Sequence, residues 1–265
     1  MNIGNEQQNK IKLGLKVASL LAFFAGLALA LLTLASAAGI WLGMWDFRQG
    51  FTLLGAANQY AGVIAYTCSG LTLGILAGSL IIKSSNTTKV VSIAAIGSLI
   101  ASLAYYIPES FRQPEGVNYP PIHDISTDTE SPPEFVAVLP LRIDAANTVV
   151  YGGSNNMTPE RLSQLTAEAY PDLVSQYYAA SVDEVFDRTL AAVDRLGWEL
   201  VSATRSAGRI EATDTTLWVR FKDDIVIIIE AQGNQTLVNA RSVSRVGTGD
   251  VGANAIRLRA FFALL

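Results

Sequence analysis

The sequence has very little cysteine and histidine, with one residue of each in 265. The lone cysteine, Cys68, excludes an intramolecular disulfide, and its position in an apolar run predicts a small packing residue. The lone histidine, His123, has Asp124, Asp128 and Glu130 nearby, but this spacing matches no established metal site and leaves most ligands missing. We therefore predict no metal site and no cofactor, and we expect turn-forming side chains in this stretch.

Clustered positive charge is also missing. Residues 1–107 carry a net charge of about +4 and residues 108–265 about −8, which together give the −4 of the whole chain. The C-terminal part is therefore acidic and contains no lysine-rich or arginine-rich run. Nucleic acid needs clustered cations to neutralise its phosphates, so we predict no nucleic-acid partner.

Charge is absent altogether from three long apolar stretches near the N-terminus. They lie between Lys16 and Asp46, between Arg48 and Lys83, and between Lys89 and Glu109. Because about 20 apolar residues cross the hydrocarbon core as a helix, we predict three membrane spans, at residues 17–42, 60–82 and 90–107. Pro108 is expected to end the third span. The first stretch has features of a signal peptide, but its apolar core is too long for one.

Basic residues beside the spans predict the orientation of the chain. Three lysines precede the first span and two separate the second span from the third, whereas the first connection holds only Arg48 beside Asp46. Because positive residues favour the cytoplasmic side, the N-terminus is expected in the cytoplasm. The C-terminal domain then lies in the periplasm, if the membrane is a bacterial inner membrane. Residues 46–58 are too apolar for a solvated loop and are expected to lie at the interface or fold back into it.

Small residues recur every four positions along the second span, at Gly70, Gly74 and Gly78. The other two spans carry matching stripes: Ala22, Gly26 and Ala30 in the first, and Ala94, Ser98 and Ser102 in the third. Such stripes let helix backbones approach closely. We predict a three-helix bundle within one chain, with the alternative that the stripe joins separate copies. No ionisable side chain lies within a span, which disfavours a transporter and favours an anchor.

The C-terminal half begins with residues 108–135, which are rich in proline and acidic residues and have no regular period. They are expected to form an extended tether and the start of a folded domain at residues 136–265. Thr158 and Pro159 open a short predicted helix. Ser181 caps a longer one, whose apolar residues have helical spacing and which ends at Gly197.

After Trp198 the apolar pattern changes to a period of two. It predicts strands at residues 199–204, 209–213, 217–221, 225–230 and 237–246, with turns at residues 206–208, 222–224 and 232–234. Short connections require antiparallel neighbours. Asp250 is expected to cap a last helix, with Val251 and Leu258 facing inward. The predicted fold class is α+β: a three-helix transmembrane bundle at residues 1–107, then a two-layer domain with a 4–5-stranded antiparallel sheet and helices on one face.

Several ordered motifs in this half resemble one known family. They are PPIHDISTD at 120–128, a helix ending in Gly197-Trp198, RIEAT at 209–213, RFKDD at 220–224, and RSVSRVG followed by D, G, NA, R and R from Arg241 onward. Together they resemble the domain of unknown function 1499 family of bacteria and plants, over roughly residues 115–265. The resemblance implies a domain boundary but no activity. Some members of this family have an N-terminal membrane segment.

Alternation along the last predicted strand places Ser242 and Ser244 toward the helices and the neighbouring arginines on the other face. With the same parity, this open face carries the candidate ligand-binding residues Arg209, Glu211, Trp218, Arg220, Arg241 and Arg245. Guanidinium groups bind carboxylates and phosphates bidentately, so an anionic lipid, a wall polymer or an envelope protein is a candidate partner. The alternative is that the arginines of this face form cross-strand ion pairs with Glu211, Asp223 or Asp224.

No catalytic motif is present in the sequence. There is no Gly-x-Ser-x-Gly elbow, and no Gly-Lys-Ser/Thr follows the glycines at 247, 249 and 252. We therefore predict no catalytic residues and a membrane-anchored envelope protein whose extracytoplasmic domain binds or scaffolds another component. The alternative is an envelope lipid or cell-wall hydrolase that uses outward carboxylates, Glu211 with Asp223 or Asp224, as acid and base.

Overall fold

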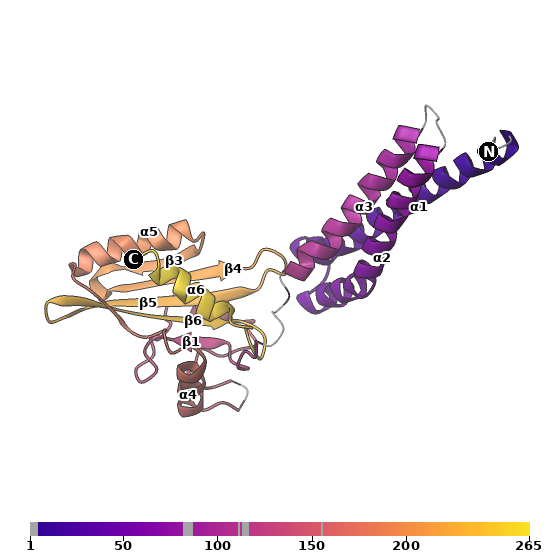
Figure 1. The fold of residues 1–265 in the computed structure, drawn as a ribbon. Helices are drawn as coiled ribbons and strands as arrows, with labels where there is room; N and C mark the ends of the chain where they lie inside the picture. The colour runs from indigo at the N-terminus through magenta and orange to yellow at the C-terminus, as the bar shows by residue number, and fades with distance from the viewer. Residues whose placement is uncertain (1–4, 82–86, 111, 113–116, 155) are drawn as a thin grey trace. The chain divides into compact units, whose positions relative to one another are not determined.

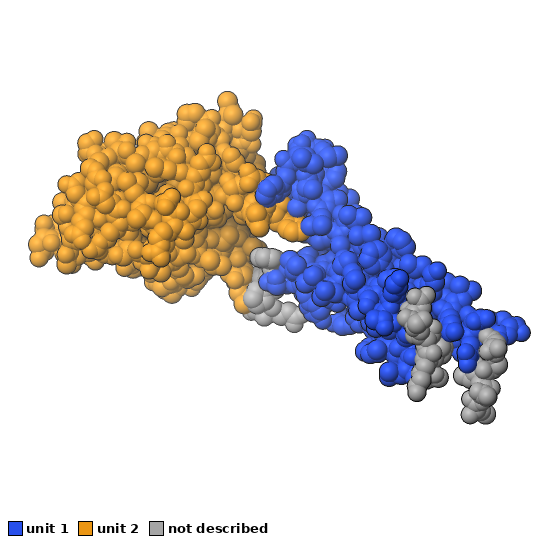
Figure 2. Space-filling model, turned by 90° about the horizontal axis from the view of Figure 1, so that it is seen from above, with its two compact units in different colours: residues 1–114 blue, residues 115–265 orange. Residues whose placement is uncertain are grey.

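The computed structural model describes residues 5–81, 87–110, 112, 117–154 and 156–265. The chain forms two compact units, residues 1–114 and residues 115–265, which Figure 2 shows in different colours. The boundary between them falls inside the proline-rich stretch 108–135. Part of that stretch is regular structure in the second unit, because a short strand, β1 (Asp124–Ser126), lies within it.

The first unit consists of three helices, α1 (Asn5–Trp41), α2 (Phe47–Ile81) and α3 (Thr87–Ser110) (Figure 1). All three are long and apolar enough to cross a membrane, so the three predicted apolar helices are confirmed, and each is longer than the predicted span. The predicted end of the third span is wrong. Pro108 lies inside α3, where a lost backbone hydrogen bond close to a helix end is tolerated. Most of residues 46–58 form the first turns of α2, and the Asp46 carboxylate accepts a hydrogen bond from the Gln49 N–H.

Small side chains pack the three helices together. Two buried clusters join all three: Ala22, Ala65, Cys68 and Ala101 in one, and Leu29, Ala57, Ala61 and Ala104 in the other. The closest backbone approach is between α1 and α3, because a Cβ atom at Gly26 would overlap the Gly97 carbonyl. The bundle was predicted, but its closest contact was not. A Cβ atom at Gly70 or Gly74 would meet no described atom within 4 Å.

The second unit is built on a six-stranded antiparallel sheet. The other strands are β2 (Gln176–Tyr178), β3 (Glu199–Thr204), β4 (Arg209–Thr215), β5 (Lys222–Gln232) and β6 (Gln235–Ser244). Their order is β1-β6-β5-β4-β3, and β2 pairs with the first half of β6. The α+β class is confirmed. β1 and β2 were not predicted, because three residues are too few to show a period.

The connection between β4 and β5 differs from the prediction. Thr215 pairs with Lys222 in the sheet, so residues 216–221 connect the two strands and residues 217–221 form no strand of their own. Asp223 and Asp224, which were predicted to form a turn, lie inside β5. The strand pattern continues through Leu217 and Val219 because the connection is itself rich in apolar residues.

Helices cover one face of the sheet. The helices are α4 (Pro159–Ala169), α5 (Val182–Arg195) and α6 (Ala253–Phe262); α5 and α6 lie over the same face and α4 lies near β1 (Figure 1). Ser181 Oγ accepts a hydrogen bond from the Glu184 N–H, which confirms the predicted cap of α5. The central cluster joins side chains of the helices to the inner face of the sheet, including Phe186 and Phe261.

The opposite face of the sheet is covered in part by chain from residues 133–149. This segment contains a short 3-10 helix, η1 (Leu139–Arg142). Phe135 and Val138 from the segment form a second buried cluster with Val226 of β5 and Val243 of β6. The prediction of an open, arginine-rich face is therefore wrong for the part of the sheet that lies under this segment.

Candidate functional site

The predicted site residue Arg241 is buried, with 2% of its surface exposed. Its Nε and Nη2 atoms donate to the two carboxylate oxygens of Asp124, at 2.8 and 2.7 Å. The same guanidinium donates to the carbonyl oxygens of Pro133 and Val149. Arg241 therefore ties strand β1 and the covering segment to β6, and its donors are engaged inside the domain.

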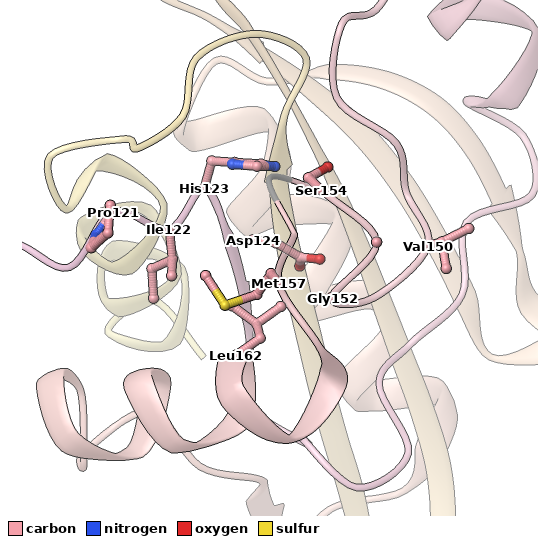
Figure 3. A pocket seen from close by; sticks show the side chains of 10 residues that line it. Pro121, Ile122, His123, Asp124, Val150, Gly152, Ser154, Met157 and Leu162 are labelled. Carbon is pink, nitrogen blue, oxygen red and sulfur yellow. The ribbon is translucent and has the colours of Figure 1, made fainter.

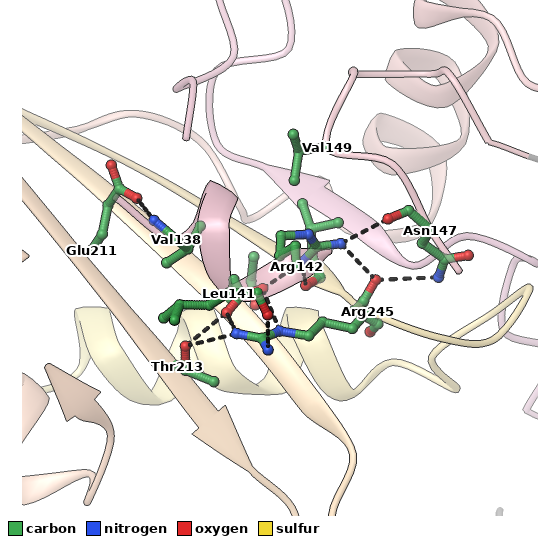
Figure 4. A network of polar contacts seen from close by, with 12 residues as sticks. Val138, Leu141, Arg142, Asn147, Val149, Glu211, Thr213 and Arg245 are labelled. Carbon is green, nitrogen blue, oxygen red and sulfur yellow. Dashed lines mark hydrogen bonds and ion pairs between the residues drawn. The ribbon is translucent and has the colours of Figure 1, made fainter. Parts of the chain in front are cut away.

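Arg245 lies in a second buried polar cluster, around the Asp224 carboxylate (Figure 4). Arg245 donates to both oxygens of Asp224, at 2.9 and 2.8 Å, and Arg142 of η1 donates to the same carboxylate. Thr213 Oγ1 adds a hydrogen bond at 2.7 Å. Burial by itself would raise the pKa of Asp224, but the hydrogen bonds from Arg245 and Thr213 and the charge of Arg142 outweigh it and hold the pKa below its ordinary value.

Glu211 is completely buried and holds the covering segment in place. Its two oxygens accept hydrogen bonds from the backbone N–H groups of Val136 and Val138, each at 2.9 Å (Figure 4). Arg209 lies 3.7 Å from Glu211 and donates to the carbonyl of Glu134. The alternative of a cross-strand ion pair is thus confirmed for Arg245 with Asp224. Arg209 and Glu211 both lie on β4, so their ion pair runs along one strand.

The hydrolase alternative required carboxylates that project outward. Glu211, Asp223 and Asp224 are all buried, and each is engaged by an internal donor. Asp223 accepts a hydrogen bond from Arg257 of α6 at 2.6 Å. These groups therefore do not form an exposed acid and base, and nothing in the structure supports the hydrolase alternative.

The two remaining predicted site residues lie apart from this face. Trp218 and Arg220 belong to the connection between β4 and β5, so the strand parity used to place them does not apply. Trp218 is half-buried, and Arg220 is exposed with a φ of 58°. Four of the six predicted residues therefore lie on this face of the sheet, each engaged in internal ion pairs or hydrogen bonds, around three separate carboxylates.

The helix-facing side of the motif from Arg241 to Arg259 forms a third polar cluster. Ser242 Oγ donates to Asn254 Oδ1 at 2.6 Å, and Asn254 donates to Ser244 Oγ at 2.9 Å, which confirms the predicted direction of both serines. Asp250 accepts from the N–H groups of Gly252 and Asn254 and so stabilises the start of α6, although Gly252 occupies the N-cap position itself. Burial raises the pKa of Asp250 above its ordinary value despite these hydrogen bonds. Val251, predicted to face inward, is exposed.

A small pocket lies beside strand β1 and was not predicted (Figure 3). Its volume of about 20 Å³ is enough for roughly one water-sized group. Apolar side chains make up most of its wall, and His123, Asp124 and Ser154 add polar groups; the lining residues are Pro121, Ile122, His123, Asp124, Val150, Gly152, Gly153, Ser154, Met157 and Leu162. The imidazole of His123 extends toward Ser154 in the view of Figure 3.

The turn that forms one wall of the pocket depends on Gly152. This residue has a φ of 69°, and a Cβ atom there would overlap the backbone of Thr158 and Pro159 at the start of α4. Only glycine combines this conformation with so close an approach. Gly152, Gly153 and Ser154 are about thirty residues from His123 in the sequence, so the sequence did not indicate that they line the same pocket.

His123 stands out among the residues that line the pocket. It is 5% exposed, and its Nδ1 atom has no hydrogen-bond partner among the described residues. A buried polar atom without a partner costs about 1–3 kcal/mol. Its neighbour Asp124 is held by Arg241, so one polar wall of the pocket is fixed. No group of three or more metal-ligating side chains occurs in the described parts of the chain.

These features define a class of protein with three helices able to span a membrane and a C-terminal α+β domain stabilised by buried ion pairs. The chain belongs to the family described as protein of unknown function (DUF1499), which matches residues 124–265. The match begins at Asp124, the partner of Arg241, and includes every residue of the three polar clusters. No curated protein matches the chain.

Proposed function

We propose that this protein is a non-enzymatic component of a bacterial cell envelope. The three helices anchor it in the inner membrane, with the N-terminus in the cytoplasm and the C-terminal domain in the periplasm, where it binds or scaffolds another envelope component. The distribution of lysines around the helices supports this orientation, since five lie on the side assigned to the cytoplasm.

The pocket beside β1 is the observation that carries the binding role. It combines a buried imidazole nitrogen that has no partner among the described residues with an opening lined mainly by apolar side chains. A ligand that hydrogen bonds to His123 Nδ1 recovers the free energy of the unsatisfied atom. Because Asp124 is already fixed by Arg241, that wall of the site needs little reorganisation on binding.

The size of the pocket limits what enters it. A space of about 20 Å³ accepts one water-sized group, such as a hydroxyl group at the tip of a larger molecule whose remainder stays outside. A hydroxyl can donate to or accept from an imidazole nitrogen, and the carbon atoms that carry it stay outside the pocket. The proposed ligand is therefore a hydroxyl-bearing envelope component, either a wall glycan or a lipid headgroup.

The uniqueness of His123 provides a direct test. Full-length protein, purified without a histidine tag and labelled with ¹⁵N-histidine, gives imidazole signals from this residue alone. We expect these signals to shift to saturation on titration with either a soluble wall disaccharide or glycerol phosphate, and the effective ligand identifies the source. The variant Met157→Trp, which fills the pocket, is expected to abolish the shift.

Two results would overturn the binding role. One is that neither ligand shifts the His123 signals, which would leave an ordered water as the only occupant. The other is that Met157→Trp shifts with ligand as the unmodified protein does, which would place the binding elsewhere.

A further inference from the structure

One end of the sheet in the C-terminal unit brings together four segments that are distant in sequence. The connection 216–221 lies here, because Thr215 pairs with Lys222. The backbone N–H of Arg245 donates to the Lys222 carbonyl, and the Arg245 side chain donates to the carbonyl of Leu141, so the end of η1 lies here too. The fourth segment is the beginning of the domain.

That beginning is fixed by two backbone hydrogen bonds. Ser244 N–H donates to the His123 carbonyl and Asp250 N–H donates to the Ile122 carbonyl, at 2.9 and 3.0 Å. The chain that arrives from α3 therefore joins the sheet at this same end. Ser110 and Ile122 are twelve residues apart in sequence, so the covalent chain between them spans at most roughly 40 Å.

Large apolar side chains are exposed at this end. We call four of them the apolar tip: Leu141, Ile143, Leu217 and Val251. Their exposed fractions are 51%, 88%, 74% and 61%. They come from three of the four segments, η1 with the residues after it, the connection 216–221, and the loop before α6. Apolar side chains gathered in this way on a soluble domain mark a surface that contacts another apolar phase.

The backbone supports the outward position of one of these side chains. Val251 has a φ of 48°, which is unusual for a β-branched residue and carries a cost in conformational energy. The valine side chain is exposed, so packing in the core does not compensate for this strain. Such strain is retained at sites where an outward side chain has a use.

The opposite end of the sheet has a different composition. The hairpin between β5 and β6 ends in Gln232, Gly233, Asn234 and Gln235, all exposed. The short helix η2 (Arg205–Ala207) lies at this end as well, and Arg205 forms ion pairs with Asp183 and Asp187. The β5–β6 hairpin and η2 are thus polar, whereas the apolar tip lies at the end where the chain enters the domain; Val174 and Tyr177, beside the first half of β6, are also exposed.

Charge at the apolar tip also differs from that of the whole domain. Residues 108–265 carry about −8, whereas two cations, Arg220 and Lys222 from the connection 216–221 and the start of β5, lie at the tip together with one exposed carboxylate, Asp144. Cations beside exposed apolar side chains are typical of protein surfaces that contact anionic lipid headgroups.

We propose that the apolar tip inserts into the headgroup region of the bilayer that holds α1–α3. The short chain between Ser110 and Ile122 keeps this end close to the bilayer, Ile143, Leu217 and Val251 enter the interface, and Arg220 and Lys222 contact anionic headgroups. The β5–β6 hairpin, at the other end of the sheet, then points away from the membrane.

Depth-dependent fluorescence quenching tests the proposal in the full-length chain. The protein, in a Cys68→Ala background, is reconstituted into vesicles of phosphatidylcholine and phosphatidylglycerol that contain spin-labelled lipid. A single environment-sensitive fluorophore is attached through Ile143→Cys or, as the matched control, through Tyr177→Cys, since Tyr177 is exposed on β2. We expect quenching to be several-fold stronger at position 143 than at position 177.

Equal quenching at the two positions would overturn the proposal. A blue-shifted fluorophore at position 143 that spin-labelled lipid does not quench would also overturn it, because a second copy of the chain would then cover the tip. The measurement needs no ligand in the pocket and gives the same result on either side of the membrane, so its failure is distinct from failure of the proposed function.

A pair of charge variants tests the contact independently. With the fluorophore at Val251→Cys, the double substitution Ile143→Glu and Leu217→Glu is expected to reduce quenching several-fold, because carboxylates resist entry into the interface. The matched double substitution Val174→Glu and Tyr177→Glu, at exposed positions away from the tip, is expected to leave it unchanged. Unchanged quenching in the first variant would contradict docking through the tip.

Discussion

At the scale of single residues, the arginines of the C-terminal domain hold together segments that are far apart in sequence. Arg241 joins β6 to Asp124, more than a hundred residues earlier, and Arg142 and Arg245 share the carboxylate of Asp224. A buried arginine needs several acceptors, and backbone carbonyls of the covering segment supply part of them. The motif that carries the family resemblance therefore encodes internal contacts.

Asp224 provides the sharpest test of this view. In the variant Asp224→Asn, Arg142 and Arg245 lose their shared counter-charge, and removing one partner of a buried pair costs about 3–5 kcal/mol. The pKa of Asp224 in the folded protein is below its ordinary value of about 3.9. Its contribution to stability is therefore complete above about pH 4 and is lost as the pH falls through the folded-state pKa.

The measurement is urea unfolding of the full-length protein in detergent, followed by tryptophan fluorescence from neutral pH to about pH 3. The free energy of unfolding should differ most between the variant and the unmodified protein at neutral pH, and the difference should narrow below about pH 4. Asp172→Asn is the matched control, since Asp172 forms an exposed pair with Arg259 and its loss costs about 0–1 kcal/mol. Equal losses in the two variants would contradict a structural role for the buried cluster.

At this scale, the sequence predicted on which face of the sheet a side chain lies, but not whether that side chain is buried. The period of two correctly placed Ser242 and Ser244 toward the helices and Arg241 and Arg245 on the other face. It could not show that Phe135 and Val138 cover that face, because the covering segment is non-periodic and distant in sequence. Arg142 and the pocket beside His123 were missed for the same reason.

At the scale of secondary-structure elements, periodicity and capping residues were enough for the helices and the longer strands. α5 begins after Ser181 and β3 spans residues 199–204, as predicted. The prediction was wrong at residues 217–221, where an apolar connection imitates a strand. The proposed contact of Leu217 with lipid accounts for this apolar composition. A period of two in the sequence cannot distinguish such a surface loop from a buried strand.

The helix bundle gives a prediction at this scale, about which glycines form its closest contact. Gly97→Ala is expected to destabilise the bundle by about 1–3 kcal/mol, because its Cβ atom would overlap the backbone of α1 at Phe23 and Ala22 and force the helices apart. Gly74→Ala is the matched control, since its Cβ atom meets no described atom within 4 Å. Thermal unfolding in detergent, followed by circular dichroism, measures both variants.

A result in which Gly74→Ala costs as much as Gly97→Ala would contradict the α1–α3 contact. It would instead support the sequence-based alternative, in which the Gly70 and Gly74 face of α2 joins separate copies of the chain. Crosslinking of the same variants in detergent separates loss of the bundle from loss of a dimer.

At the scale of the whole molecule, the division of charge and hydropathy along the sequence predicted two parts with different surroundings. The structure confirms three helices able to span a membrane and a separate compact unit from residue 115. The exact boundary between the two units was not predictable, because the proline-rich stretch has the composition of a tether even where β1 pairs with β6 in the sheet.

The proposed topology has three crossings, and this odd number would place the two ends of the chain on opposite sides of the membrane. An alkaline phosphatase fused after Leu265 is active only when exported to the periplasm, so we expect activity there. Under the proposed orientation, the same enzyme fused between the second and third spans is expected to be inactive, because Lys83 and Lys89 favour the cytoplasmic side. A fluorescent protein that matures only in the cytoplasm should give the reciprocal pattern at the two positions. Phosphatase activity at both junctions, or at the internal junction alone, would require a different number of crossings or the reverse orientation.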